Sequence, residues 1–295
     1  MVQEEERGKR ERERERERQR ERERMAEVRS MEEGTLGNAT EDQKNCISKL
    51  GLNISIPFLQ KIFAEVLGTY FLIFAGCGAV TVDKKTKGVI TFPGVCAVWG
   101  LAITVMIYAV GHISGAHFNP AVTIAFAACR RFSLKQVPAY VGAQMVGATL
   151  ASGTLRLLLG GGRELFAGTT PAGSEVQALV MEFIVSFYLM FVISGVATDN
   201  RAIGELAGIA VGATILLNVA ISGPVSGASM NPARTLGPAI IANRYQSIWV
   251  YIVGPSSGTI AGAWTYNLIR YTDKPLRELT KSGSFLKSLK MRGSG

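Results

Sequence analysis

Charged side chains are scarce through most of this 295-residue chain, although its overall charged content of 19% looks ordinary. Residues 1–50 hold 27 of the charges, whereas residues 51–269 hold only 19 in a stretch of 219. Soluble domains carry roughly 25% charged residues. This scarcity argues against an ordinary soluble enzyme and makes the lipid bilayer the environment that the composition fits.

Signatures of metal, phosphate and export chemistry are missing as well. The cysteines, Cys46, Cys77, Cys96 and Cys129, have no C-x-x-C spacing, which argues against a metal site or a disulfide framework. Residues 160–162 lack the Lys-Ser/Thr of a phosphate loop, and the amino-terminal arm lacks the apolar core of a signal peptide. We expect no cofactor, no metal and no enzymatic reaction. The net charge of +9 requires no nucleic acid, because membrane topology and anionic lipid account for it.

Long uncharged runs fill the middle of the chain. Residues 88–129 contain no Asp, Glu, Lys or Arg, and residues 206–243 contain only Arg234. A helix that crosses ~30 Å of hydrocarbon needs ~20 apolar residues, so each run holds one crossing and about half of another. We predict an all-α membrane protein with six crossings and two partial ones. The crossings are expected at residues 62–82, 90–111, 136–156, 177–198, 204–222 and 247–269.

Six crossings place both termini on one side of the membrane. If that side is cytoplasmic, residues 51–295 place 12 Lys/Arg inside and six outside, as the positive-inside rule requires. We predict a cytoplasmic arm at residues 1–57, a membrane domain at 58–270 and a cytoplasmic tail at 271–295. The Glu-Arg alternation at residues 11–24 gives i,i+4 pairs of like sign, so the arm should be mostly disordered. Met25 or Met31 is a second candidate start of the native protein.

The membrane domain contains an internal duplication. IFAEVLGTYFL at 62–72 matches LVMEFIVSFYL at 179–189, and SGAHFNPAV at 114–122 matches SGASMNPAR at 226–234. The two repeats, residues 58–160 and 175–270, each hold three crossings with a partial one between the second and third. An odd number of crossings inverts the second repeat, and solute sites form near the midplane of such inverted repeats.

Each repeat carries the triplet Asn-Pro-Ala, at Asn119, Pro120 and Ala121 and at Asn231, Pro232 and Ala233. Asn is a strong helix N-cap and Pro is favoured at the first helical position, so each triplet predicts the start of a short helix. Two helix N-termini that meet inside the membrane repel cations, while the Asn amides donate to a water or hydroxyl oxygen. We therefore expect a pore that excludes protons and other ions.

These motifs resemble the pore loops of the major intrinsic protein family, the aquaporins and aquaglyceroporins. The resemblance rests on GHISGAHFNPAV at 111–122 and GASMNPARTLGP at 227–238, and it covers residues 58–270. GELAG at 204–208 and KSGSFLK at 281–287 make the chain most similar to the plant nodulin-like intrinsic proteins. The resemblance implies six transmembrane helices with two re-entrant half-helices, a homotetramer, and a place in the plasma membrane or another plant cell membrane.

Four residues match the family's outer constriction, namely Trp99, Val219, Ala228 and Arg234. Arg234 is also the one charge in 38 residues at membrane depth, which by itself marks it as functional. Trp99, Val219 and Ala228 would offer apolar surface, and the guanidinium of Arg234 would offer N–H donors. This combination suits a solute with carbon on one side and hydroxyls on the other. We expect glycerol-like polyols and neutral metalloid hydroxides, such as arsenite, boric acid or silicic acid, with some water.

Glu65 and Glu182 recur at equivalent depth in the two repeats, where an ionised carboxylate is costly unless it is hydrogen-bonded. The resemblance implies that they support the re-entrant loops. The alternative is a proton-coupled secondary transporter that uses these two acids. His112 and His117 flank the first triplet; they lack a third metal ligand, so we expect them to pack the loop, and we assign His112 to its support.

The tail contains one candidate regulatory site. Lys281 lies three residues before Ser284 and Leu279 lies five before it, a spacing that basophilic kinases read. The similarity to the phosphorylated tail of the nodulin-like subgroup adds to this pattern. We therefore expect a protein kinase as a partner, and the added charge would act beside the basic cytoplasmic rim.

Overall fold

The computed structural model describes residues 55–160, 162, 165, 167–202 and 204–270. The chain divides into two compact units, Met1–Leu59 and Gln60–Gly295, and only residues 55–59 of the first unit are described. Most of the charged arm, both candidate start methionines and Ser284 lie outside the described residues. The contacts below all belong to the second unit.

The described residues fold into helices and connecting loops, which confirms the expectation of an all-helical chain. Two short helices, α4 (Pro120–Ala128) and α8 (Pro232–Ala242), follow α3 and α7. Single turns of 3₁₀-helix lie at Leu134–Gln136 and Gly204–Leu206. The long helices are α2 (Ile56–Lys85), α3 (Phe92–Ser114), α5 (Val137–Leu159), α6 (Glu175–Thr198), α7 (Ala207–Ser226) and α9 (Val250–Ile269).

Four helical stretches are long and apolar enough to cross a membrane, judged by length and composition. They are Ile56–Lys85, Phe92–Ser114, Glu175–Thr198 and Gly204–Ser226. Helices α5 and α9 have comparable lengths of 23 and 20 residues. The outer surfaces remain apolar, and Leu101, Leu157 and Leu268 are more than 60% exposed.

Helix starts and stops follow local sequence signals. Ser174 and Gln177 form a capping box at the start of α6, with both reciprocal hydrogen bonds present. Helices α3 and α7 end at Gly115 and Gly227, which take left-handed φ values of 94° and 81°. Glycine is the residue that adopts this conformation without a steric cost. Each glycine thereby turns the chain into the loop before a short helix.

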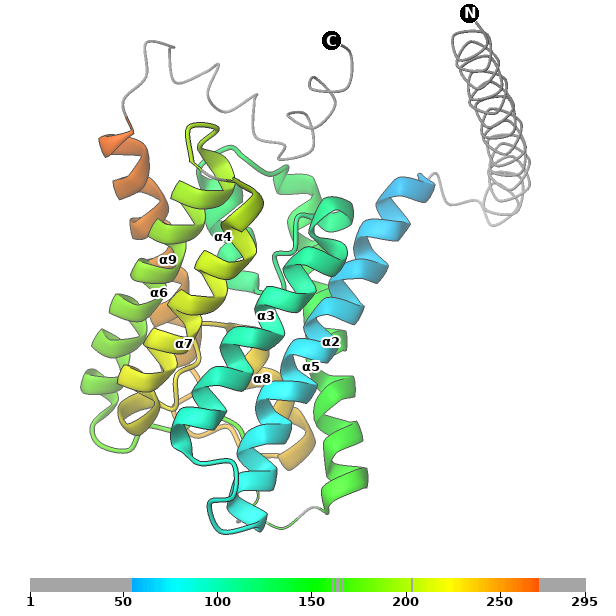
Figure 1. Cartoon of the computed structure of the whole chain (residues 1–295), viewed down its shortest axis with the longest axis vertical. Coiled ribbons are helices and arrows are strands. Elements are labelled where there is room, and N and C mark those ends of the chain that lie inside the picture. Colours follow the sequence, from blue (N-terminus) through cyan, green and yellow to red (C-terminus); the bar gives the residue numbers. More distant parts are fainter. Residues whose placement is uncertain (1–54, 161, 163–164, 166, 203, 271–295) are drawn as a thin grey trace, which may run out of the picture. The chain divides into compact units, whose positions relative to one another are not determined.

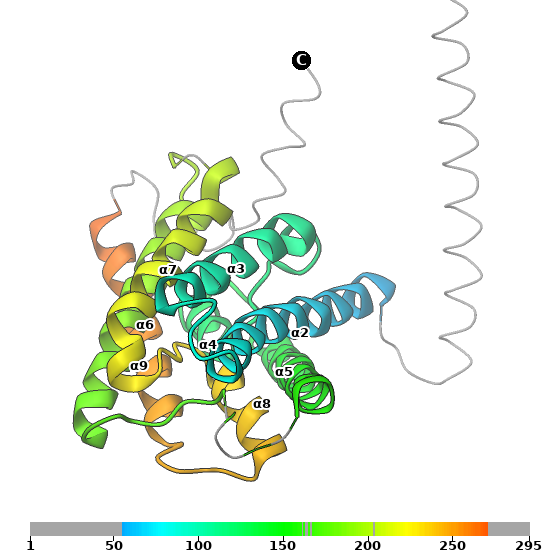
Figure 2. The same cartoon turned by 60° about the horizontal axis from the view of Figure 1, so that its bottom comes forward.

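The two halves interlock through their short helices. Figure 1 and Figure 2 show α2 and α5 on one side of the bundle and α6 and α9 on the other, with α3 and α7 side by side between them. Helix α4 packs against α9 of the other half, and α8 packs against α5. Thr259 of α9 donates a hydrogen bond to the carbonyl of Ala121 at 3.1 Å, and a Cβ at Gly237 would lie 2.7 Å from the carbonyl oxygen of Ala148. The short helices are therefore held by both halves.

Asp199 joins three segments at the end of α6. Its carboxylate accepts hydrogen bonds from Arg201 Nε and Nη2 at 3.0 and 2.7 Å and from the Tyr266 hydroxyl at 3.0 Å. Arg270 Nε lies 3.5 Å away, at the end of α9. The hydrogen bonds from Arg201 hold the pKa of Asp199 well below its ordinary value. This cluster ties the α6–α7 loop to the last turn of α9.

Asp199→Asn is expected to lower the free energy of unfolding at neutral pH by about 1–2 kcal/mol, because charge-assisted hydrogen bonds are lost. Since the folded-state pKa is depressed, the carboxylate stabilises the fold above its unfolded pKa of roughly 4, and this contribution disappears as the pH falls towards the folded pKa. Thermal unfolding in detergent at several pH values measures the difference between wild type and variant. It should be constant near neutrality and shrink below about pH 4; a difference that stays constant there would contradict this assignment.

Candidate pore and constriction

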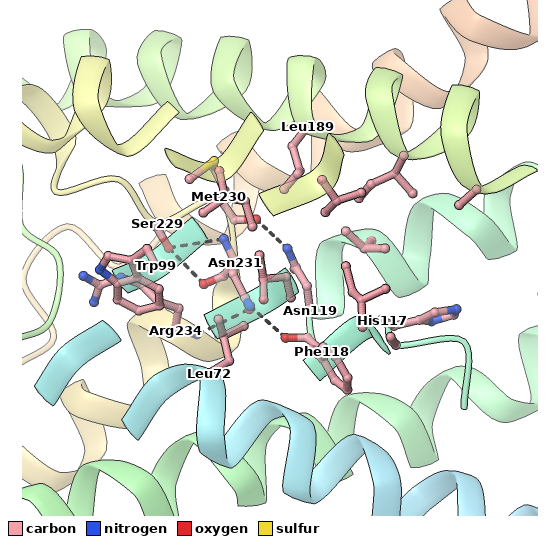
Figure 3. A pocket seen from close by; sticks show the side chains of 18 of the residues that line it. Leu72, Trp99, His117, Phe118, Asn119, Leu189, Ser229, Met230, Asn231 and Arg234 are labelled. Carbon is pink, nitrogen blue, oxygen red and sulfur yellow. Dashed lines mark hydrogen bonds between the residues drawn. The ribbon is translucent and has the colours of Figure 1, made fainter. Parts of the chain in front are cut away.

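A narrow cavity of about 110 Å³ lies where the two short helices begin (Figure 3). Much of its wall is apolar and comes from α3, α6 and α7, with Ile103, Ile193 and Ile215 among its residues. Polar groups enter from the loops that precede α4 and α8. Six of the residues singled out from the sequence line this one cavity, namely Trp99, Asn119, Val219, Ala228, Asn231 and Arg234.

Asn119 and Asn231 cap the two short helices and face each other in Figure 3. Asn119 Oδ1 accepts from the backbone N–H of Ala121 at 2.9 Å, and Asn231 Oδ1 accepts from that of Ala233 at 2.9 Å. Pro120 and Pro232 are the first residues of α4 and α8. Each side-chain amide also reaches the opposite half. Asn119 Nδ2 donates to the carbonyl of Met230 at 2.7 Å, and Asn231 Nδ2 donates to that of Phe118 at 2.8 Å.

The loop before each short helix has an unusual backbone. Ala116 and Phe118 in the first loop, and Ala228 and Met230 in the second, have φ values between 48° and 53°. Non-glycine residues in this left-handed region cost of order 1–3 kcal/mol each, so the surroundings must hold them there. The conformation turns the carbonyls of Phe118 and Met230 towards the opposite asparagine, as the reciprocal hydrogen bonds show.

Glu65 holds the first loop. Its Oε1 accepts from the hydroxyl of Ser114 at 2.7 Å and from the N–H of His117 at 3.0 Å, and its Oε2 accepts from the N–H of Phe118 at 2.8 Å. Gln144 Nε2 of α5 donates to the same Oε2 at 2.8 Å and to the Thr123 hydroxyl. The carboxyl group is fully buried. Its acceptor capacity is thus used by the loop and by α5.

Glu182 holds the second loop in the same way. Its Oε1 accepts from the hydroxyl of Ser226 at 2.6 Å and the N–H of Ser229 at 2.8 Å, and its Oε2 accepts from the N–H of Met230 at 2.7 Å. Glu182 is also fully buried. The hydroxyl of Tyr251 donates to the carbonyl of Ser226 at 2.7 Å and fixes the end of α7. Matching carboxylates therefore hold the strained loops in both halves.

Arg234 and Trp99 stack against each other in the cavity wall. The guanidinium carbon lies 5.0 Å from the centroid of the indole ring, a cation–π geometry. Arg234 Nη1 donates to the carbonyl of Ala167 at 2.8 Å, and Arg234 Nε is buried without a hydrogen-bond partner among the described residues. Val219 and Ala228 line the same cavity as small apolar groups. The site thus combines an aromatic plane, small apolar surfaces and a guanidinium.

Comparisons of the sequence with known proteins match the chain to one family. The model of the family described as "Major intrinsic protein" matches residues 53–266. The chain belongs to the major intrinsic protein family. Aquaporin NIP1-1 of Oryza sativa subsp. japonica is 70% identical over 269 residues, which cover 91% of this chain and 93% of that protein. Nodulin-26 of Glycine max is 62% identical over 250 residues, which cover 85% of this chain and 92% of that protein.

A solved structure extends the match to three dimensions. The aquaglyceroporin from Plasmodium falciparum gives a TM-score of 0.66 at 27% identity, over 72% of this chain and 96% of that one. The relatives place the chain in the nodulin-like subgroup of the major intrinsic proteins, which confirms the resemblance seen in the sequence. The chain is therefore an integral membrane protein of a family of channels for small solutes. The transporter alternative is not favoured.

The two histidines of this major intrinsic protein have different surroundings. His117 is buried, with Nδ1 3.1 Å from the Thr123 hydroxyl and its ring 4.9 Å from that of Phe126. His112 lies exposed in the last turn of α3. His117 thus packs against the first short helix as expected, whereas His112, assigned to loop support, is exposed. Among the described residues, no three His, Cys, Asp or Glu side chains are grouped as a metal site.

The connection between α5 and α6 contributes contacts that no sequence pattern indicated. Beside the Ala167 carbonyl, the hydroxyl of Thr169 lies 2.7 Å from that of Thr235, which lies 2.6 Å from that of Ser229. Thr169, Thr235 and Ser229 are all buried. This chain of hydroxyls fastens the connection to α8 and to the cavity wall. The α5–α6 connection thereby supports Arg234, which lines the cavity.

Proposed function

We propose that this protein is a passive channel for small uncharged solutes and that it excludes protons and other ions. Its solutes are glycerol-like polyols and neutral metalloid hydroxides such as arsenite, boric acid and silicic acid, with some water. Supporting this proposal are the relatives named aquaporin and the solved aquaglyceroporin. The conduction path is the cavity between the two asparagines and the constriction of Trp99, Val219, Ala228 and Arg234.

The observation that carries the proposal is the pairing of apolar and donor surfaces in one narrow cavity. Trp99, Val219 and Ala228 offer surface to the carbon side of a polyol, and the guanidinium of Arg234 offers N–H donors to a hydroxyl. A neutral solute gains these contacts without the desolvation cost of an ion.

Ions are excluded by the two short helices. Asn119 and Asn231 cap helices whose N-termini converge on the cavity, and each N-terminus carries roughly half a positive charge. Arg234 is the one charged residue among the described residues that line the cavity. The field along the path is therefore positive, which opposes cations and protonated water chains.

The membrane arrangement is part of the same proposal. The six long helices cross the bilayer as an inverted 3+3 repeat, and α4 and α8 enter it from opposite faces as re-entrant half-helices. Both termini are cytoplasmic, the host membrane is the plasma membrane or another plant cell membrane, and four subunits assemble with a pore in each. The domain boundaries are those predicted from the sequence, and a kinase modifies Ser284 in the tail.

Purified protein in liposomes tests the solute range. Stopped-flow light scattering should show swelling in glycerol, urea and boric acid gradients well above that of empty liposomes. A pH-sensitive dye trapped in the same liposomes should report no added proton leak when a pH gradient is imposed. Proton or sodium conduction that scales with protein content would contradict the proposed exclusion, and absence of glycerol and boric acid flux would contradict the solute class.

A further inference from the structure

Gly76 of α2 supports the indole of Trp99 from outside the constriction. A Cβ at position 76 would lie 2.3 Å from Cδ2 and Cε2 of Trp99 and 2.4 Å from Cε3. Contact with three adjacent ring atoms means that the glycine backbone packs on the six-membered ring. Real Cβ atoms essentially never approach this closely, so any larger residue would displace the ring. The absence of a side chain at Gly76 sets the position of Trp99.

Cys77, the next residue of α2, supports Arg234. Its Sγ lies 3.9 Å from Arg234 Nη1 and 3.7 Å from the Ala167 carbonyl, which accepts from the same Nη1. The thiol is 1% exposed. Cys77 and Ala167 also line a second cavity of about 650 Å³. The sulfur of Cys77 and the carbonyl of Ala167 thus contact the same guanidinium nitrogen, Nη1.

We propose that Gly76 and Cys77 form a positioning pair that sets the solute selectivity of the constriction. Neither residue is among those that the constriction was expected to contain, and each holds one member of the Trp99–Arg234 pair. Because the indole and the guanidinium stack on each other, a displacement of either one changes the constriction. The inference rests on the proposed function, since it presumes that these two residues meet the solute.

Substitution of Gly76 should narrow the constriction, and substitution of Cys77 should widen it. Gly76→Ala pushes the indole away from α2, and the crowded constriction should pass glycerol about tenfold more slowly while water falls less. Cys77→Ala removes the thiol and leaves room into which the guanidinium can retract. This widening should raise erythritol permeability relative to glycerol by about threefold. Cys77→Ser keeps a polar hydrogen-bonding group at this position and should preserve the wild-type ratio.

The test is stopped-flow swelling of liposomes that contain the full-length chain, with water, glycerol and erythritol gradients on each preparation. Ratios of permeabilities do not depend on how much of the protein is folded. Gly142→Ala and Cys129→Ala serve as matched controls, because a Cβ at Gly142 meets no atom within 4 Å and Cys129 is also a buried free cysteine. Both controls should leave the ratios at wild-type values.

A second variant separates the positioning role from a folding defect. In a Trp99→Ala background the ring that would clash is gone, so adding Gly76→Ala should cause no further change in the ratios and should restore folding if the single variant lacks it. Wild-type ratios in both Gly76→Ala and Cys77→Ala would overturn the positioning pair, provided that Trp99→Ala alone changes them. If Trp99→Ala also leaves the ratios unchanged, the proposed constriction itself is wrong, and the pair falls with it.

Discussion

Glu182→Gln is expected to abolish transport and to lower the yield of folded protein sharply. The carboxylate accepts three hydrogen bonds, from the Ser226 hydroxyl and from the N–H groups of Ser229 and Met230. A glutamine has one acceptor oxygen, so its NH₂ group must face a buried donor. If that NH₂ group replaces Oε2, it faces the N–H of Met230, and both donors lose an acceptor. Each unsatisfied buried donor costs about 1–3 kcal/mol, so the pair costs about 2–6 kcal/mol.

This loss reaches the pore directly. Met230 has a left-handed φ of 53°, and its N–H and carbonyl are bonded to Glu182 and to Asn119 respectively. Without the carboxylate, the strained loop relaxes and releases the contact between the two halves. The measurements are glycerol flux in liposomes and the fraction of protein that elutes as a single species in detergent.

Glu175→Gln is the matched control, since it is the same substitution in the first turn of α6. Glu175 is exposed, and of its partners Trp249 is exposed and Ser247 is half-buried. This variant should keep its flux and yield. If Glu182→Gln transported glycerol at the wild-type rate, the carboxylate would not hold the second loop as described.

Trp99→His combined with Val219→His is expected to convert the constriction to one that favours water. The indole and Val219 provide the apolar surface that a polyol backbone needs, whereas two imidazoles add polar groups beside Arg234. Losing an apolar contact of this size costs about 1–3 kcal/mol, so glycerol permeability should fall about 10- to 100-fold. Water makes no such apolar contact and should change much less.

The measurement is the ratio of water to glycerol permeability in stopped-flow swelling. The matched control is Trp249→His with Val253→His, because both residues are exposed on the outer surface near the start of α9. Its ratio should equal that of wild type. An unchanged ratio in the Trp99 and Val219 variant would remove these residues from the path of the solute.

Features encoded in short stretches of sequence could be predicted. The Asn-Pro pairs predict where α4 and α8 begin, because N-capping and the fixed φ of proline act within one helical turn. Uncharged runs longer than one crossing located both the long helices and the segments between them. The duplicated acids at Glu65 and Glu182 were visible because repetition exposes a pattern that a single copy does not.

Contacts between distant segments could not be predicted. Arg234 and Cys77 are 157 residues apart, and Arg234 and Ala167 are 67 apart, with nothing in the local sequence to connect them. Gln144, which bridges Glu65 and Thr123, occurs in a plain apolar stretch. Which of the two histidines is buried depends on the direction of the chain after α3, which the turn at Gly115 sets.

The dependence of glycerol flux on glycerol concentration and on a pH gradient tests the central claim most directly. Liposomes that contain the purified protein are mixed with increasing glycerol concentrations, with and without a proton gradient across the membrane. A passive channel predicts an initial rate that rises linearly, is equal in both directions and ignores the proton gradient. A flux that saturates and accelerates with an inward proton gradient would contradict the account.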